Sequence, residues 1–166
     1  MTTKLQKVNK GFTIIEVLIV LAIAGLIMVV VFLAVPALQR QARNNTLNTN
    51  ANNLFTGVNN YIGNNNGTLP APMAATAPAS NTVTIGASGN VETVRVDGSI
   101  TTVQIDAGTT PITSSSPVGT VQIVRGVNGK CNATASGLYM GNGTGRSVAL
   151  LFVAESGTAN IVKCLN

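Results

Sequence analysis

The sequence predicts an α+β fold in which one long N-terminal helix packs on an antiparallel β-sheet. Two observations predict it. An apolar block near the N-terminus continues into a segment with apolar residues at helical spacing. The rest of the chain has short runs rich in Val, Ile and Thr, separated by turn residues. At 166 residues, the chain is long enough for one domain with an appendage.

The apolar block covers residues 12–35, a run of 24 residues in which Glu16 is the only charged residue. A helix of this length spans about 36 Å, which is enough to cross a bilayer. The block is too long for the apolar region of a cleaved secretory signal, and it is apolar on all sides. Lys4, Lys7 and Lys10 precede it and place the N-terminus on the cytoplasmic side. The chain after residue 35 is therefore expected outside.

Composition excludes several functional classes. The chain has no histidine, which removes His-based triads, His general bases and the common His-containing zinc sites. Charged residues make up 9% and aromatic residues 4%, both low for a cytosolic enzyme. The acidic residues after the apolar block are too scattered to suggest a catalytic pair. We therefore expect neither an enzyme nor a bound cofactor or metal.

The net charge of +5 includes the three lysines of the leader. Without residues 1–11, seven basic residues remain against five acidic ones, a net charge of +2. A basic chain favours nucleic acid as a partner. That interpretation weakens once the three lysines are assigned to targeting, so nucleic acid is left open as a partner but not indicated.

Glu16 is the exceptional residue of the apolar block. A carboxylate at the centre of a bilayer costs about 2.5–3.5 kcal/mol on insertion scales. Glu16 lies only about 7–8 Å along the helix from Gly11, so it can reach the interface. One interpretation is a tolerated interfacial acid. The other is a residue that needs a positive partner inside an apolar assembly, and cleavage after Gly11 would create such a partner, an amine on Phe12.

Residues 10–16, KGFTIIE, followed by VLIVLAIAGLI, resemble the class III signal of type IV prepilins and pseudopilins. The resemblance is close over residues 7–45. It implies that a membrane peptidase cuts after Gly11 and methylates Phe12. It also implies that Glu16 pairs with the N-terminus of a neighbouring subunit in a filament. The implied organisation is a leader (1–11), a transmembrane and filament-core helix (12–36), an amphipathic half of that helix (37–62) and a β-rich head (63–166).

Two helix-weakening residues lie inside or at the end of the apolar block. Gly25 stands where the family often has a helix-loosening glycine, whereas Pro36 falls a few residues later than the common pilin proline. Glycine costs about 1 kcal/mol and proline about 3 kcal/mol in a helix interior. The resemblance implies a role for both residues in assembly, through melting of the helix between them. A simple kink, or no melting, is the alternative.

After Pro36 the sequence becomes amphipathic. Apolar residues recur at three- and four-residue spacing, with asparagines on other faces, and we expect this stripe to pack on the head. The stripe consists of Leu47, Ala51, Leu54, Phe55, Val58 and Ile62. A stop signal follows at residues 63–67, and residues 63–82 are expected to form a surface loop.

Several strands are predicted in the remaining sequence. Residues 91–96 and 99–106 are expected to form a hairpin around a type I′ turn at Asp97 and Gly98. The tetrapeptide TVQI occurs at 102–105 and again at 120–123, which is too short for a structural repeat. Residues 147–154 are apolar on both faces and indicate a strand covered on both sides; residues 159–165 are expected to follow it as the last strand.

Cys131 and Cys164 are the only cysteines. An even pair in an exported domain favours a disulfide, and two buried free thiols are the alternative. In pilins, a disulfide-bounded C-terminal region commonly forms an exposed edge of the subunit, which the resemblance implies here.

The resemblance implies a structural subunit of a type IV pilus filament that serves surface attachment, twitching motility or DNA uptake. Its expected partners are other copies of the chain, the prepilin peptidase, the pilus assembly machinery and the inner membrane. It would be a single-pass precursor with its head outside, and extracellular after assembly. One alternative is a pseudopilin of a type II secretion or competence system. Another is a membrane-tethered binding module, which would not be cut.

Overall fold

The computed structural model describes residues 11–166 except 88, 108–111, 135–136, 142 and 158. The contacts within the chain define two compact units, the first ending at Gln39 and the second beginning at Arg40. Helix α1 (Ile14–Asn64) contributes to both. The leader predicted over residues 1–11 lies outside the described residues, apart from Gly11.

In the first unit, the described chain consists of residues 11–13, which have no regular secondary structure, and the first part of α1. The helix begins directly after Thr13 and runs without interruption through Gly25 and Pro36. Every residue from 11 to 39 is exposed. This part of the helix therefore has no core of its own to bury its apolar side chains.

In the second unit, α1 buries one stripe against the strands. Its fully buried members are Leu47, Ala51, Leu54 and Val58, with Tyr61 almost buried. This confirms the predicted amphipathic helix, in which Phe55 and Ile62 lie half-buried at the border of the core. The helix ends at Asn64, inside the predicted stop signal of residues 63–67. Gly67 then takes a positive φ of 78° and donates to Ile62 O, 2.8 Å away.

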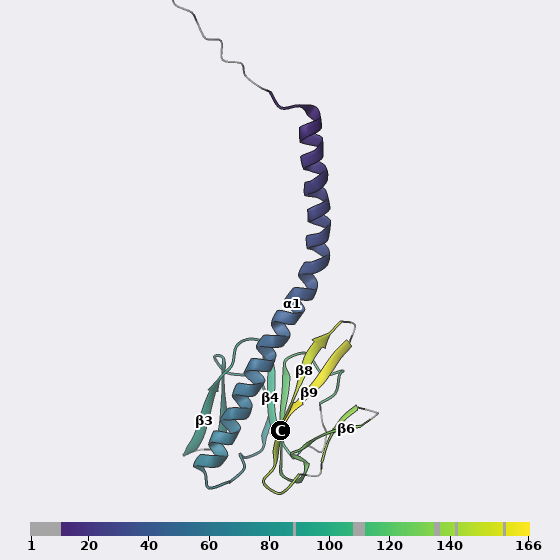
Figure 1. Ribbon diagram of the computed structural model, residues 1–166. Helices are drawn as coiled ribbons and strands as arrows, with labels where there is room; N and C mark the ends of the chain where they lie inside the picture. Colours follow the sequence, from purple (N-terminus) through teal and green to yellow (C-terminus); the bar gives the residue numbers. More distant parts are fainter. Residues whose placement is uncertain (1–10, 88, 108–111, 135–136, 142, 158) are drawn as a thin grey trace, which may run out of the picture. The chain divides into compact units, whose positions relative to one another are not determined.

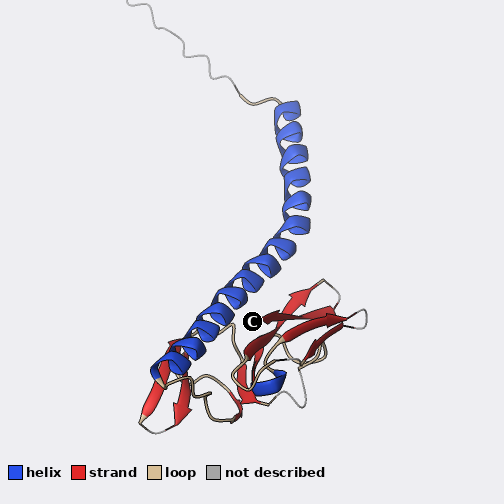
Figure 2. Cartoon of the chain, turned by 60° about the horizontal axis from the view of Figure 1, so that its bottom comes forward, coloured by secondary structure: helices blue, strands red, loops and turns tan. Residues whose placement is uncertain are grey.

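The described strands of the second unit form three sheets (Figures 1 and 2). The largest has five strands in the order β1-β4-β5-β8-β9, and the others are the pairs β2-β3 and β6-β7. The bounds in chain order are β1 (Met73–Thr76), β2 (Thr82–Ala87), β3 (Asn90–Arg95), β4 (Thr102–Asp106), β5 (Thr120–Arg125), the 3₁₀ turn η1 (Gly126–Asn128), β6 (Cys131–Thr134), β7 (Gly137–Met140), β8 (Val148–Ser156) and β9 (Ala159–Leu165). An α+β fold with one long N-terminal helix is confirmed.

The predicted hairpin across residues 91–106 is wrong. Strand β3 pairs with β2, placing Val83 opposite Val94, whereas β4 pairs with β1 and β5. The physical reason lies at Asp97, whose Oδ1 accepts hydrogen bonds from Ser99 N at 2.8 Å and from Asn50 Nδ2 at 2.5 Å. The chain is thus anchored on α1 at this point and crosses from one sheet to the other. Residues 63–82 are also more than a loop, because β1 lies among them.

The two TVQI tetrapeptides are neighbours in the large sheet. Strands β4 and β5 run parallel, and the two copies pair in register, from Thr102 opposite Thr120 to Ile105 opposite Ile123. The sheet is therefore mixed, and the prediction of a purely antiparallel sheet is wrong at this pair. In a parallel register, identical residues stand side by side, so Val103 and Val121 face the same core.

Strand β8 is buried on both faces, as its sequence predicts. Leu150, Phe152 and Ala154 belong to the core shared with α1. The residues between them are buried on the opposite face, and Gln122 is buried there too, with 0% of its surface exposed. Ile112 N donates to Gln122 Oε1 at 2.9 Å, so the chain at Ile112 lies against this second face. Strand β9 follows β8 with the predicted bounds.

A disulfide joins Cys131 in β6 to Cys164 in β9, with 6.1 Å between the Cα atoms. The predicted disulfide is confirmed. It closes a loop with a sequence separation of 33 residues. Chain entropy alone assigns such a loop about 3–4 kcal/mol of stabilisation. The bridge holds the β6-β7 pair against the last strand of the large sheet.

The end of β8 is held against α1 by three polar side chains. Arg43 forms a bidentate ion pair with Glu155, with Nη2 to Oε2 at 2.7 Å and Nε to Oε1 at 3.1 Å. Asn44 donates to Glu155 O at 2.7 Å and accepts from Glu155 N at 2.9 Å. The hydrogen bonds from Arg43 lower the pKa of Glu155, although slight desolvation opposes them. The helix is thus fixed across the strand by hydrogen bonds as well as by apolar contact.

Two glycines of α1 predict opposite responses to the same substitution. A Cβ at Gly57 would overlap Cγ2 of Val94 on β3, whereas a Cβ at Gly63 meets nothing within 4 Å. We expect Gly57→Ala to destabilise the head by about 1–3 kcal/mol through overpacking. Gly63→Ala should leave stability unchanged or raise it by up to about 1 kcal/mol through helix propensity. Thermal unfolding of the two variants measures both; equal effects would contradict the helix–strand packing.

Candidate processing and assembly site

The predicted cleavage point lies just before the start of α1. Gly11 and Phe12 are outside the helix, and 91% of the Phe12 surface is exposed. A Cβ placed on Gly11 meets nothing within 4 Å. No packing within the described chain therefore requires glycine at this position. A requirement for glycine here would come from the enzyme that binds the segment.

Thr13 and Glu16 form a capping box at the first turn of α1. Glu16 Oε2 accepts two hydrogen bonds from Thr13, one from the backbone N–H and one from the hydroxyl, both at 2.8 Å. The Glu16 N–H lies 3.4 Å from the Thr13 hydroxyl oxygen and donates to it. This is the reciprocal arrangement of a Thr cap and a Glu three residues later. The carboxylate also lies where the helix dipole favours negative charge.

The capping box changes how Glu16 tolerates an apolar environment. Thr13 donates both hydrogen bonds to Oε2, so its own chain satisfies one of the two carboxylate oxygens of Glu16. Among the described residues, Oε1 accepts no hydrogen bond and remains open to a donor from outside. Thr13 lies in the motif predicted from the sequence, but its capping role was not predicted, although the T-x-x-E spacing directly before an apolar run is a known signal for such a cap.

The apolar segment of residues 12–35 presents a continuous exposed surface. Its large side chains are exposed to between 38% and 91%, the extremes being Val35 and Phe12. A patch this large does not stay in water and marks a membrane or protein contact. Helix α1 is long and apolar enough to cross a membrane. Gly25 and Pro36 both lie within this exposed unit as helical residues, and a Cβ at Gly25 meets nothing within 4 Å.

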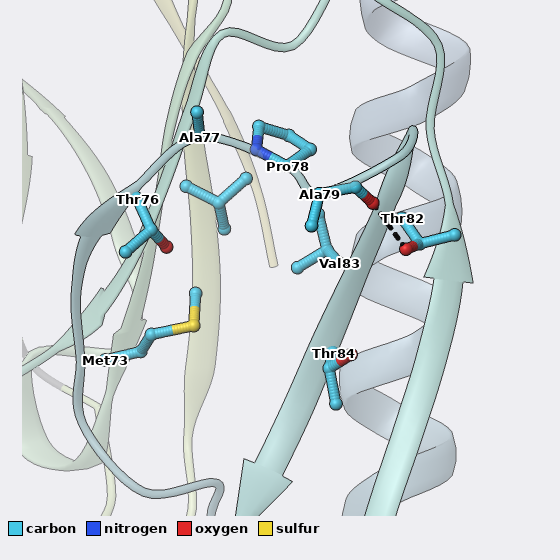
Figure 3. A pocket seen from close by; sticks show the side chains of 9 residues that line it. Met73, Thr76, Ala77, Pro78, Ala79, Thr82, Val83 and Thr84 are labelled. Atoms are coloured by element: carbon cyan, nitrogen blue, oxygen red, sulfur yellow. Dashed lines mark hydrogen bonds between the residues drawn. The ribbon is translucent and has the colours of Figure 1, made fainter.

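The described part of the head offers no comparable chemical site. It contains no group of three or more Cys, Asp or Glu residues placed to hold a metal ion. A groove of about 300 Å³ lies between β1 and β2, with Val103 also lining it (Figure 3). All its lining residues are uncharged, among them Met73, Thr76 and Val83. It therefore holds no acid–base pair.

Residues 6–32 match the family of the prokaryotic N-terminal methylation motif. The chain carries the class III signal peptide of type IV pilins. The matched residues contain Gly11, Phe12, Thr13 and Glu16, so the whole capping box lies inside the signal. No curated protein and no solved structure matches the chain.

The class III signal supports a precursor that is similar to type IV pilins and pseudopilins. It implies processing by a prepilin peptidase, pilus-type assembly and a membrane-anchored precursor. The match ends at residue 32, so it covers the signal and the start of the apolar helix and does not extend to the head.

Substitution of Gly11 tests the signal directly. We expect Gly11→Ala to leave the full-length precursor in the membrane, because the peptidase no longer finds glycine at the cut site. The variant should fold normally, since a Cβ at Gly11 meets nothing within 4 Å. Immunoblotting for the size of the membrane-bound chain measures this. Gly25→Ala is the matched control, since its site is equally open and should permit cleavage. Normal cleavage of Gly11→Ala would contradict the assignment of the cut site.

Proposed function

We propose that the chain is the structural subunit of a type IV pilus filament and has no enzymatic role. The observation that carries the proposal is the single acid of the apolar segment, Glu16, held at the helix start inside the class III signal. In this proposal the precursor is cut after Gly11 and methylated on Phe12. The head is outside the membrane before assembly and on the cell surface after it.

Assembly exchanges one apolar surrounding of the helix for another. Before assembly, lipid covers the exposed side chains of residues 12–35; in the filament, the equivalent helices of other copies cover them. Lipid and a bundle of apolar helices are similar solvents for such side chains, so the transfer needs little net free energy. A head-to-tail helical assembly does not close on itself, and repeated docking therefore gives a filament.

Glu16 supplies register to this otherwise uniform surface. Cleavage creates an amine on Phe12 at the helix N-terminus, where the helix dipole disfavours positive charge. In every copy, Thr13 occupies one carboxylate oxygen of Glu16 and leaves the other available to a neighbouring subunit. The free oxygen of a neighbour's Glu16 can accept from the amine, and both charges are then paired in a dry environment. A subunit docked one step wrong leaves them unpaired.

The remaining parts of the proposal concern partners and role. The peptidase and the assembly machinery act on the chain from the inner membrane. The region bounded by the disulfide is a candidate for the exposed edge of the subunit, because Cys131 ties β6 and β7 to the last strand. Surface attachment, twitching motility and DNA uptake are the roles that such a filament serves. Within the helix, Gly25 and Pro36 are the positions at which we expect the backbone to change conformation on assembly.

A pseudopilin of a secretion or competence system is the competing role. It shares all the N-terminal features, so the two roles are separated by phenotype. If the chain is a pilus subunit, we expect long surface filaments at native expression. These filaments should disappear when the gene for this chain is deleted. A secretion defect without such filaments identifies a pseudopilin and overturns the pilus proposal.

Substitution of Glu16 separates charge from hydrogen bonding. We expect Glu16→Ala and Glu16→Gln to be inserted and cleaved but to lower filament yield about tenfold or more, because each leaves the new amine unpaired. The glutamine variant keeps an oxygen that can accept from Thr13 and so preserves the cap. Filament yield in a sheared surface fraction, relative to mature chain in the membrane, gives the result. Normal yield from Glu16→Gln would show that charge pairing does not set the register.

A further inference from the structure

The charged residues of the head are unevenly distributed along the sequence. From residue 40 to residue 106, three basic residues stand against three acidic ones. From residue 107 to the end, four basic residues stand against a single acid, Glu155. We call these four basic residues the basic cluster: Arg125, Lys130, Arg146 and Lys163. The excess positive charge of the head therefore comes from the C-terminal part that contains the disulfide.

Arg125 and Arg146 lie close together at one end of the β5-β8 pair. Arg125 ends β5 and stands opposite Val148, two residues after Arg146. Gly126 N donates to Ser147 O at 2.9 Å, which continues the pairing beyond the strands. Cross-strand neighbours are about 5 Å apart and each residue adds at most about 3.8 Å, so the Cα atoms of the two arginines lie within about 13 Å.

Lys130 is held beside Arg146 by the turn η1. A Cβ placed on Gly129 would overlap the carbonyl oxygen of Ser147. The residue before Lys130 is therefore in direct contact with the residue after Arg146. The two strands and the turn thus gather three of the four basic residues around the backbone of Ser147.

The disulfide places Lys163 in the same region. Lys130 directly precedes Cys131, and Lys163 directly precedes Cys164. The Cα atoms of the two cysteines are 6.1 Å apart, so the Cα atoms of the two lysines lie within about 14 Å of each other. The fold therefore brings together four positive charges that are spread over the C-terminal sequence.

The only acid of this part of the sequence is engaged elsewhere. Glu155 is paired with Arg43 near the other end of β8, about 23 Å along the strand from Val148. None of the four basic residues forms an ion pair with a described residue.

Asp106 is the acid closest to the cluster in the register of the sheet, and it belongs to the other face. It stands opposite Val124, and successive side chains of a strand point to opposite faces, so Arg125 is directed away from it. Its Oδ2 accepts from Gln122 Nε2 at 2.8 Å and from Gln104 Nε2 at 3.2 Å. The charge of Asp106 is therefore used within the sheet.

The basic cluster is open to a partner from outside the chain. Lys130, Arg146 and Lys163 are exposed, and Arg125 is half-buried. The Nε of Arg125 is buried and has no hydrogen-bond partner among the described residues. The guanidinium of Arg146 passes over Gly67, just beyond the C-terminus of α1, where the helix dipole favours a cation. That dipole accounts for Arg146, but it does not explain why three further cations are gathered beside it.

We propose that the basic cluster binds an acidic polysaccharide outside the cell. The proposal deepens the surface-attachment role of the proposed function and rests on it for the position of the head outside the membrane. The carboxylates of such a polymer are separated by uncharged, hydroxyl-bearing parts of the sugars. The surface between the cations is likewise uncharged, with Val127 65% exposed and Thr144 exposed. An apolar side chain suits the C–H face of a sugar ring, and a hydroxyl group suits its hydroxyls.

A nucleic acid fits the same surface less well. A DNA duplex carries one negative charge per about 1.7 Å of its axis and rewards many phosphate contacts, whereas the cluster has four separated cations. Single strands are bound largely by stacking of bases on aromatic side chains. The aromatic side chains described in the head, those of Phe55, Tyr61 and Phe152, are buried or half-buried. Nucleic acid is therefore the competing ligand in the test.

Binding of alginate, a polysaccharide that carries carboxylates, tests the proposal. The chain extracted from the membrane in a non-ionic detergent should bind immobilised alginate more tightly than neutral dextran, and its affinity should fall as salt is raised. We expect Lys130→Gln and Lys163→Gln each to weaken binding about threefold, and the double variant about tenfold. Arg95→Gln is the matched control, because it removes the same charge from an exposed residue of β3 outside the cluster.

Two further measurements separate charge from folding. Lys163→Arg keeps the positive charge and should bind as the unsubstituted chain does. The melting temperatures of the glutamine variants should match that of the unsubstituted chain in the same detergent, because the two lysine side chains are exposed.

The outcomes distinguish this proposal from the proposed function. Binding to alginate no tighter than to dextran, or an equal loss from Arg95→Gln, overturns the polysaccharide site. Tighter binding to a DNA duplex than to alginate, weakened by the same lysine substitutions, also overturns it and assigns the cluster to nucleic acid. The binding assay needs no filament. A chain that binds alginate through the cluster but makes no filament at native expression therefore overturns the proposed function and supports this site.

Discussion

Glu16 is the one ionisable side chain between residues 12 and 39, and the rest of the account depends on how its charge is satisfied. In the uncut chain, Thr13 supplies two hydrogen bonds and the helix start supplies a favourable dipole. This makes an acid tolerable near the edge of a bilayer. Processing then adds an amine at the same end of the helix, and this amine is the positive charge with which the carboxylate of a neighbouring copy can pair.

The two parts of α1 are both helical, but they cover their apolar side chains in different ways. The residues before Pro36 are apolar on every side and have no core, so they need an apolar surrounding from outside the chain. The later residues bury Leu47, Leu54 and Val58 against the strands, and tertiary packing offsets the poor helix propensity of their Asn and Thr neighbours. The ion pair of Arg43 with Glu155 and the anchoring of Asp97 on Asn50 fix this part of the helix on the head.

Sequence reasoning succeeded where the signal is local. The both-sided burial of β8, the bounds of β9 and the amphipathic stripe follow from residues within a few positions of one another. It failed where contacts between residues far apart in the sequence determine which strands and side chains pair. The Asp97-Gly98 dipeptide has the composition of a tight hairpin turn, but Asn50, 47 residues away, redirects it. The parallel pairing of the two TVQI copies and the ion pair of Arg43 with Glu155 have no local signal at all. In the candidate site, Gly11, Phe12 and Glu16 were identifiable from the motif, whereas the capping role of Thr13 was not predicted despite its spacing to Glu16.

The central claim is that a processed, charge-paired helix start turns a membrane precursor into a filament subunit. The intact mass of the protein in a sheared surface fraction tests it most directly. The account predicts a chain that lacks residues 1–11, carries one added methyl group and lacks two hydrogens because of the Cys131–Cys164 bridge. A full-length mass, found only in the membrane fraction, would contradict the account and leave a tethered head with Glu16 as an interfacial acid.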